Sequence, residues 1–319
     1  MRLGQNPAKK AKSVPQPESV TVAVITYIPE LVGYYAQSLD VLKTCLSSIW
    51  RNTDTPYDLM VFDNGSCDEV RDYLRTSQDE GKIQFLILSE KNYGKAGGWN
   101  FVFGAAPGKY IAYTDSDVYH YPGWLAPQIE ILEKFPGTGM VTGMPMWTPE
   151  EYSTSTIEWA EGRDDISLER GRFLAWDDYW KHSQSLGADE DKARAHYDST
   201  EDIVVQGVGG RLFVGAAHFQ FVAPKAVLKG LLPIPSNRPM GQVRLLDIAL
   251  NNAGFLRFST PDWWVQHMGN TVTLEDVTDG VVPRPAKGRK AVPRFWKRKI
   301  PRRIAAYLYH KTFEILYKE

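Results

Sequence analysis

The sequence has few features of a secreted, membrane-spanning or nucleic-acid-binding protein. Its 319 residues include only two cysteines, Cys45 and Cys67, whose spacing fits no metal or redox motif, so we expect a reducing compartment. No apolar run reaches the roughly 18 residues that span a bilayer. A formal net charge of −1 gives no general attraction to nucleic acid. No internal repeat is visible. Any electrostatic function must therefore be local.

The remaining composition is that of an ordinary globular protein, with 43% hydrophobic and 24% charged residues. This length can bury the core of one large domain. Residues 1–19 are basic and contain prolines, but they lack the apolar core of a signal peptide. We expect them to form a disordered tail.

Strand-like and helix-like segments alternate in the first half of the chain. Apolar, β-branched runs predict strands at Val20–Thr26, Asp58–Phe62, Lys82–Leu88 and Tyr110–Thr114. A helical period predicts helices at Leu39–Trp50, through Val70 to Leu74, and at Trp124–Phe135. This alternation indicates βαβ units, and hence an α/β fold with a mainly parallel central sheet.

Polar residues follow three of these predicted strands, as Thr26-Tyr27, Asp63-Asn64 and Asp115-Ser116-Asp117. The carboxyl ends of parallel strands meet at one edge of a sheet, where nucleotides bind in open α/β folds. Asp115 and Asp117 can hold a hard divalent cation and its phosphates, although an acidic turn after a strand has the same pattern.

The glycine-rich stretch 91–100, with Gly94, Gly97 and Gly98, is predicted to be a loop that opens into a short helix. Its backbone N–H groups could approach a phosphate or ribose closely. It is neither a Walker A motif nor a dinucleotide fingerprint, and a merely flexible loop is the alternative.

The second half of the chain differs in composition from the first. Residues 148–206 are acidic and aromatic and are predicted to be an insertion on the open, acceptor side of the site. A strand is predicted at Arg211–Ala223, then a helix at Val243–Asn252 that carries Asp247, and two short strands at Phe255–Ser259 and Trp263–His267.

The segment 282–319 is basic and amphipathic. Between residues 284 and 303 its positive charges are interrupted by no acid, and Phe295, Trp296 and Ile300 are interleaved. This pattern predicts peripheral contact with an anionic membrane, which would place a cytoplasmic protein at the inner face of the cell membrane. A solvated basic helix that caps the domain is the alternative.

The order of these motifs resembles that of the GT-A glycosyltransferases of family 2, which include many bacterial rhamnosyl-, galactosyl- and N-acetylglucosaminyl-transferases. The resemblance covers Val20 to Asn270 and rests on Asp63-Asn-Gly-Ser66, Asn92 to Asn100, Asp115-Ser-Asp117, a distal Asp247 and His267-Met-Gly269. It implies a Rossmann-like, nucleotide-sugar-binding GT-A domain at 20–281 with a C-terminal acceptor half.

The resemblance also implies roles for individual residues. Those expected at the donor nucleotide are Thr26, Tyr27, Asp63, Asn64, Asn92, Gly94, Lys95, Gly98, Asn100, Asp115 and Ser116. Asp115 would lie near the ribose and a metal-bound water, Asp117 would ligate the metal directly, and His267 would complete the metal sphere. Asp247 matches the family's catalytic base, but Leu246 stands where a glutamate is usual.

The expected function is transfer of a sugar from a UDP, dTDP or GDP sugar to a hydroxyl of a glycan or lipid-linked acceptor, with Mn²⁺ or Mg²⁺. The cation stabilises the leaving diphosphate, and one carboxylate, Asp247, takes the proton of the attacking hydroxyl, which gives inversion. The alternatives are a retaining glycosyltransferase, a sugar-phosphate nucleotidyltransferase and a non-catalytic glycan-binding protein.

Overall fold

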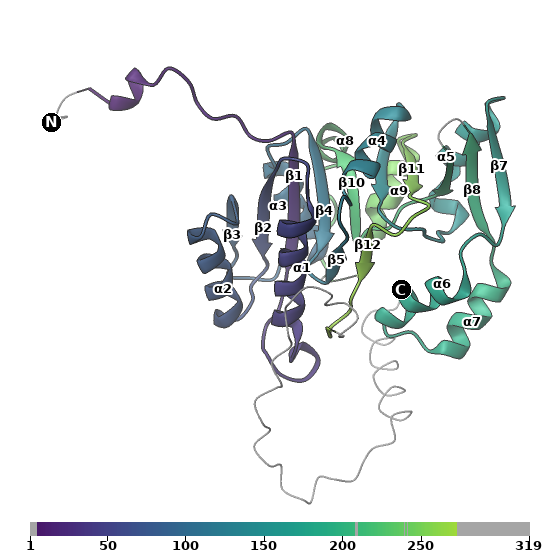
Figure 1. The fold of residues 1–319 in the computed structure, drawn as a ribbon, viewed down its shortest axis with the longest axis horizontal. Coiled ribbons are helices and arrows are strands. Elements are labelled where there is room, and N and C mark those ends of the chain that lie inside the picture. Colours follow the sequence, from purple (N-terminus) through teal and green to yellow (C-terminus); the bar gives the residue numbers. More distant parts are fainter. Residues whose placement is uncertain (1–4, 208–209, 239, 241, 273–319) are drawn as a thin grey trace, which may run out of the picture.

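The computed structural model describes residues 5–207, 210–238, 240 and 242–272. The predicted basic segment 282–319 lies outside these residues, so its membrane contact stays a prediction from sequence. Within the described part of the chain, no helix is long and apolar enough to cross a membrane. The described N-terminal residues run away from the sheet and contain a short 3-10 helix, Pro7–Lys10 (Figure 1).

Ten strands of the described residues form one sheet, in the order β3-β2-β1-β4-β10-β6-β11-β9-β8-β7 (Figure 1). They are β1 (Val20–Thr26), β2 (Tyr57–Asp63), β3 (Phe85–Leu88), β4 (Tyr110–Asp115), β6 (Thr138–Thr142), β7 (Ile166–Gly171), β8 (Asp202–Gly207), β9 (Gly210–Val214), β10 (Gln220–Pro224) and β11 (Leu256–Ser259). The first four strands are parallel, whereas most later pairs are antiparallel. The predicted α/β class is confirmed.

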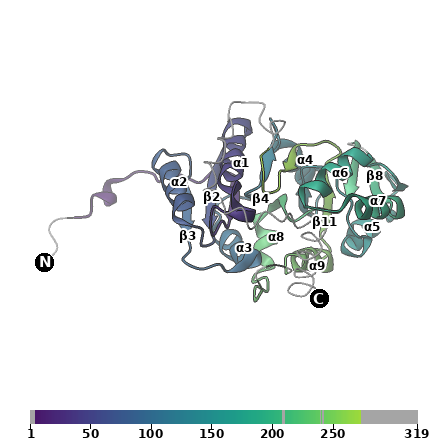
Figure 2. The same ribbon diagram turned by 90° about the horizontal axis from the view of Figure 1, so that it is seen from below.

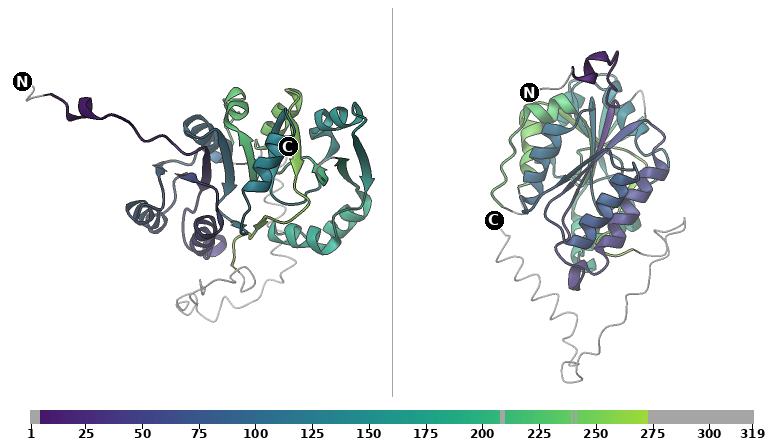
Figure 3. Two further views of the ribbon diagram at one scale, coloured as in Figure 1. Left: turned by 45° about the horizontal axis from the view of Figure 1, so that its top comes forward. Right: turned by 90° about the vertical axis from the view of Figure 1, so that its left-hand side faces the viewer.

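Helices cover both faces of the parallel half, because its strands are apolar on both sides. Along β1, Val22 and Val24 pack into one core cluster, while Ala23 and Ile25 pack into the other. The first face is covered by α1 (Ser38–Asn52), α2 (Asp68–Asp79) and α4 (Ala126–Lys134), and the second by α3 (Gly94–Ala105), α8 (Lys225–Gly230) and α9 (Arg244–Asn252). Figures 2 and 3 show the sheet between these two layers.

The glycine-rich stretch differs from its prediction, because α3 begins at Gly94 and the glycine cluster lies inside the helix. A Cβ atom at Gly98 would lie 2.9 Å from Cδ1 of Ile25 on β1. Glycine at this position therefore lets the first turns of α3 pack directly on the sheet.

The predicted strand Arg211–Ala223 is also wrong, because the chain forms two strands, β9 and β10, that are not neighbours in the sheet. Gly215 ends the first strand with a φ of 100°, and a Cβ atom there would lie 1.8 Å from Oγ1 of Thr148. The chain therefore leaves the sheet, and the loop returns beside β4, where the carbonyl of Phe219 accepts a 2.8 Å hydrogen bond from the N–H of Asp115.

Part of the predicted insertion extends the sheet. β7 and β8 pair antiparallel at its far edge, and α6 (Trp176–Ser185) and α7 (Glu190–Ser199) connect them. The shorter α5 (Thr154–Glu161) packs against β7, β11 and α9. Figure 1 shows α6 and α7 beside the end of the sheet where β12 lies. The sequence analysis did not predict β7 or β8, because β7 mixes apolar with charged residues and the apolar run of β8 is short.

A small second sheet completes the edge of the parallel half. In it, β5 (Val118–His120) pairs antiparallel with β12 (Val265–His267), and His267 lies opposite Val118. The N–H of Met268 donates a 2.8 Å hydrogen bond to the carbonyl of Asp117. This pairing brings residues 150 positions apart in the sequence to one place.

Candidate active site

A cavity of about 400 Å³ lies beyond the carboxyl ends of the parallel strands. The predicted site residues that line it are Tyr27, Asn64, Asn92, Lys95, Asp115, Ser116 and Asp117. Gly269 and Asn270 line it from the loop after β12. The structure therefore brings together most of the residues that were expected at the donor nucleotide.

Aromatic rings form one side of this cavity. Tyr27 packs edge to face on Tyr35, with 6.4 Å between ring centroids, and Tyr35 packs in the same way on Tyr34. Tyr27 and Tyr34 are 38% and 61% exposed, which leaves ring surface for a flat ligand such as a base. The sequence analysis missed Tyr34 and Tyr35, although their position shortly after a strand end is a signal for them.

Asn64 and Asn92 join the turn after β2 to the start of α3. The side-chain amide of Asn64 donates to Oδ1 of Asn92 (3.0 Å) and to the carbonyl of Gly94 (3.1 Å). Its Oδ1 accepts from the N–H of Tyr93 at 2.8 Å. These contacts position the loop that carries Lys95.

Besides Gly94, which begins α3, four residues that were expected at the nucleotide do not line the cavity. The side chain of Asp63 is fully buried, accepts a 3.1 Å hydrogen bond from the N–H of Ser66 and lies 3.5 Å from Nε of Arg71. Burial raises the pKa of Asp63, and the hydrogen bonds from Ser66 oppose that rise. The other three members of this set are Thr26, Gly98 and Asn100. A direct contact of these residues with nucleotide stays a prediction.

Asp115 is held by two side chains. Its Oδ2 lies 2.5 Å from Nζ of Lys95, and its Oδ1 accepts a short hydrogen bond from the hydroxyl of Tyr113. Burial, followed by the charge of Asp115, raises the pKa of Tyr113, so this hydroxyl stays protonated and donates. Lys95 lines the cavity, and its ammonium group brings positive charge to the cavity wall.

Asp117 and His267 form the second charged pair, with 3.3 Å between Oδ2 and Nε2. The hydroxyl of Ser185 donates to the carbonyl of His182 at 2.6 Å, so its oxygen accepts from Nδ1–H of His267 at 2.9 Å. Nε2 of His267 is thereby directed at Asp117. Burial of His267 lowers its pKa, but the neighbouring Asp117 outweighs this and raises it.

Asp117 and His267 together supply some of the ligand atoms that a divalent cation needs. Oδ1 of Asp117 is buried and has no hydrogen-bond partner among the residues that the structure describes. A neutral His267 with its proton on Nδ1 presents the Nε2 lone pair beside this carboxylate. No cluster of three acidic, histidine or cysteine ligands exists within the described ranges, so further ligands would have to come from the substrate or water.

Asp247 lies in the first turn of α9 and is 6% exposed. Its Oδ1 lies 2.6 Å from Nη2 of Arg257, and its Oδ2 lies 3.5 Å from Nδ1 of His218. Arg257 is itself buried and donates to the backbone carbonyls of Ala216 (2.5 Å) and Tyr152 (2.6 Å). Asp247 is thus oriented by an arginine.

Comparison with known proteins identifies the domain. Residues 32–183 match the family described as "Glycosyl transferase family 2". This segment belongs to glycosyltransferase family 2. The match includes Asp63, Lys95, Asp115 and Asp117 but ends before Asp247 and His267, so the roles of these two residues stay predictions.

Proteins with similar sequences are described as glycosyltransferases. The chain is 24% identical over 140 residues to an uncharacterized glycosyltransferase of Nostoc sp., covering 42% of this chain and 43% of that protein. It is 25% identical over 131 residues to an uncharacterized glycosyltransferase of Rickettsia conorii, covering 40% of this chain and 21% of that protein. The chain thus matches less than half the length of these relatives.

Solved structures with similarity to this chain include S. aureus TarS in complex with UDP-GlcNAc, at 13% identity and a TM-score of 0.48, covering 82% of this chain and 62% of that one. A mannosyltransferase from Pyrobaculum calidifontis in complex with GDP-Man and Mn²⁺ is 15% identical, with a TM-score of 0.46, and covers 79% of this chain and 58% of that one.

Three residues that contact predicted site residues were missed by the sequence analysis. They are His218 and Arg257, which both contact Asp247, and Tyr113, which contacts Asp115. Arg257 sits in an otherwise apolar strand, and a lone charge in a buried strand is a signal for an ion-pair partner. Nothing in the sequence marks His218, because the predicted strand through this position concealed the loop.

Replacing Arg257 with methionine is expected to destabilise the domain by roughly 3–5 kcal/mol, because it leaves the carboxylate of Asp247 buried without its ion partner. Urea unfolding followed by circular dichroism measures this change. Arg163→Met is the matched control, since it removes an exposed ion pair with Asp165, and we expect little effect. Equal stability of the two variants would contradict the structural role of Arg257.

Replacing Lys95 with methionine is expected to weaken binding of nucleoside diphosphates by roughly 10- to 100-fold, since charge-assisted hydrogen bonds contribute about 1.5–3 kcal/mol. The variant also leaves the carboxylate of Asp115 without its ammonium partner. Calorimetric titration with UDP, dTDP and GDP in the presence of Mn²⁺ measures the change. Lys91→Met removes an exposed lysine of the same stretch and should bind like the parent.

Proposed function

We propose that this protein transfers a sugar from a nucleoside-diphosphate sugar to a hydroxyl group of a glycan or lipid-linked acceptor, with inversion. The observation that carries the proposal is the 400 Å³ cavity whose wall combines tyrosine rings, Lys95 and Asp117 at the carboxyl ends of parallel strands. Membership of the matched segment in glycosyltransferase family 2 supports the same reaction class.

The cavity offers a place for each part of the donor. The rings of Tyr27 and Tyr34 can stack on the base, and Asn64 and Asn92 lie beside it. Lys95 and the pair of Asp117 and His267 lie where the diphosphate would reach the strand ends. The solved structure of TarS contains UDP-GlcNAc and that of the Pyrobaculum mannosyltransferase contains GDP-Man, and the proposal includes both uridine and guanosine as the base of the donor.

Asp117 and His267 would hold a divalent cation, Mn²⁺ or Mg²⁺, through Oδ1 and Nε2. A cation at this position acts as a Lewis acid on the leaving diphosphate. The contribution of the chain is to orient both ligands, through Ser185 on His267 and through the backbone bond from Met268 to Asp117.

Asp247 is the proposed general base. The attacking hydroxyl has a very high pKa and must lose its proton as the bond to the anomeric carbon forms, and a positioned carboxylate can accept it. Arg257 occupies Oδ1, so Oδ2, on the side of His218, is the oxygen left for this proton. The proposed roles include one general base and no carboxylate nucleophile. This arrangement corresponds to a single displacement, and hence to inversion.

A thermal-shift panel tests the proposal. UDP, dTDP and GDP, each with and without Mn²⁺ or Mg²⁺, should raise the melting temperature by mass action, and the cation should enlarge the rise for the preferred nucleotide. Absence of any metal-dependent shift in the whole panel would refute the donor site. Incubation of a matching nucleotide sugar should then release the nucleoside diphosphate, whereas pyrophosphate release from a triphosphate would identify a nucleotidyltransferase.

A further inference from the structure

Two adjoining cavities lie between α6 and the core of the domain, apart from the donor cavity. Their volumes are about 300 and 250 Å³, and they share the four lining residues Pro145, Leu174, Asp178 and Trp263. We call this pair of cavities the α6 groove. The larger compartment alone reaches the lower limit for small-molecule sites, which span roughly 300–1,000 Å³, and the two compartments together exceed that limit.

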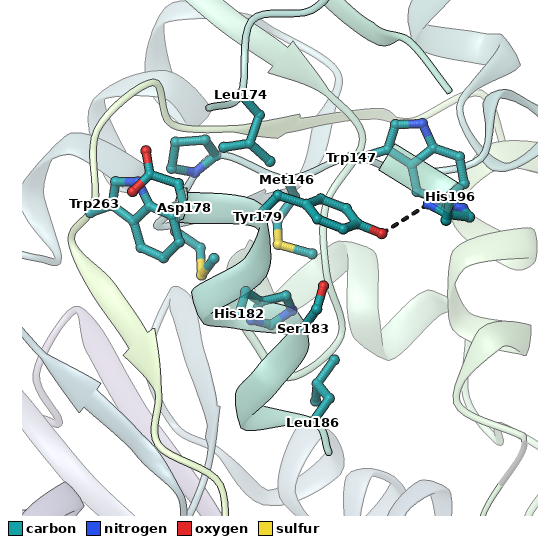
Figure 4. A pocket seen from close by; sticks show the side chains of 12 residues that line it. Met146, Trp147, Leu174, Asp178, Tyr179, His182, Ser183, Leu186, His196 and Trp263 are labelled. Carbon is teal, nitrogen blue, oxygen red and sulfur yellow. Dashed lines mark hydrogen bonds between the residues drawn. The ribbon is translucent and has the colours of Figure 1, made fainter. Parts of the chain in front are cut away.

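The walls of the groove combine flat apolar rings with a few polar groups. Figure 4 shows Trp263 and Asp178 on one side of the larger compartment, Trp147 and His196 on the other, and Tyr179 between them. The hydroxyl of Tyr179 lies 2.8 Å from Nδ1 of His196, which fixes the ring. Sugars have an apolar C–H face and a rim of hydroxyl groups, so they match such a wall better than a purely apolar ligand does.

His182 connects the groove with the active site. Its side chain lines the larger compartment, and its ring centroid lies 6.0 Å from that of His267 and 5.3 Å from that of Phe219. Nδ1 of His182 is buried and has no hydrogen-bond partner within the described ranges. A ligand hydroxyl at this end of the groove would satisfy it.

The same wall borders the proposed base. Phe219 packs against both His182 and His267, and its neighbour His218 lies 3.5 Å from Asp247. At the inner end of the groove, His182 therefore contacts His267 directly, whereas Phe219 and His218 lie between His182 and Asp247. In the proposed function the nucleotide occupies the donor cavity, and the groove shares no lining residue with that cavity, so it leaves a separate place for the acceptor.

We propose that the α6 groove binds the acceptor, and that this acceptor is a glycan of at least two sugar residues. The residue in the larger compartment presents its hydroxyl past His182, and the next residue lies in the smaller compartment. The inference rests on the proposed glycosyltransferase function, but sugar binding to the groove can be tested without the donor.

The smaller compartment determines the length of the ligand. Besides the four shared residues it is lined by Phe173, Ala175, Arg211, Phe213, Pro261 and Asp262. Arg211 lies over the ring of Phe173, at 4.7 Å from the ring centroid, so an aromatic face and a row of donors occur together again. This repetition of ring and polar group suits a second sugar, whereas a lipid chain would leave Arg211 and Asp262 without a polar ligand.

Saturation-transfer difference NMR tests the groove without a donor. The probes are methyl glycosides of glucose, galactose, mannose, rhamnose and N-acetylglucosamine, α- and β-linked disaccharides of these sugars, and octyl glucoside. At least one disaccharide should bind more tightly than its methyl glycoside. Asp178→Asn should weaken that binding roughly tenfold, because a hydrogen bond to a charged group is lost at the junction of the compartments.

Asp177→Asn is the matched control, because Asp177 precedes Asp178 on α6 but is exposed and lines neither compartment. It should bind the disaccharide like the parent. Trp263→Ala, checked for folding by its melting temperature, should lose binding of the disaccharide. The metal-dependent shift with the nucleoside diphosphate should be unchanged in all three variants, so it reports the donor site separately.

The proposal is overturned if no sugar probe binds, if Asp178→Asn and Asp177→Asn bind equally, or if octyl glucoside binds more tightly than every disaccharide. A parent protein that binds the disaccharide but shows no metal-dependent nucleotide shift would retain the groove and refute the transferase. A parent with the nucleotide shift but no sugar binding would refute the groove alone.

Discussion

Replacing Asp117 with alanine should abolish the metal-dependent part of nucleoside-diphosphate binding. Oδ1 of Asp117 is the buried carboxylate oxygen that the described residues leave without a partner, and a hard cation held by one carboxylate and one imidazole cannot keep its place without the carboxylate. The increase in melting temperature that Mn²⁺ adds to the effect of the nucleotide should therefore disappear.

His267→Ala should weaken the same coupling to a smaller extent, because an imidazole is the poorer ligand for a hard cation. Asp54→Ala, which removes an exposed carboxylate after α1, serves as the control and should behave like the parent. Metal-dependent nucleotide binding that survives in both Asp117→Ala and His267→Ala would place the cation elsewhere.

Asp247→Asn should lower turnover about 10²- to 10⁴-fold, which is the usual contribution of a general base. Asparagine keeps the shape of the side chain and an oxygen that can face Nη2 of Arg257, so the fold and the donor cavity should be retained. Donor binding, measured by the thermal shift, should be nearly normal. The rate is measured as release of nucleoside diphosphate in the presence of the acceptor.

A variant with unchanged turnover would show that the proton goes to another group. His218 lies 3.5 Å from Asp247 and is the nearest candidate on the chain, and the leaving phosphate of the donor is the other. The two cases differ in the product, because retention of the anomeric configuration, visible by NMR, would indicate a retaining mechanism in place of inversion.

The parallel half of the fold was predictable because its signals are local. A β-branched strand such as Val20–Thr26 is apolar along its whole length, which indicates burial on both faces, and amphipathic helices follow such strands. Parallel strands end at the same edge of a sheet. The location of Asp63 and Asp115 at strand ends was therefore enough to predict that both lie at that edge.

The antiparallel half was predicted less well because its signals are weak or misleading. β7 is only partly buried and contains charged residues, and the apolar run of β8, from Ile203 to Val205, is short and follows a charged residue. The stretch from Arg211 to Ala223 has strand character throughout, and only the contact of Gly215 with Thr148 shows where the chain must turn. Such contacts depend on which segments meet in space.

By itself, the sequence determined the α/β class and the parallel strands whose ends bring Asp63, Asp115 and Asp117 to one edge, and its resemblance to a family supplied the predicted roles of Asp247 and His267. The tertiary structure alone decided the partners of these groups: Lys95 on Asp115, Ser185 on His267 and Arg257 on Asp247. Charged groups leave water only when a partner compensates their desolvation, and that partner comes from whichever distant segment the folded chain places beside them.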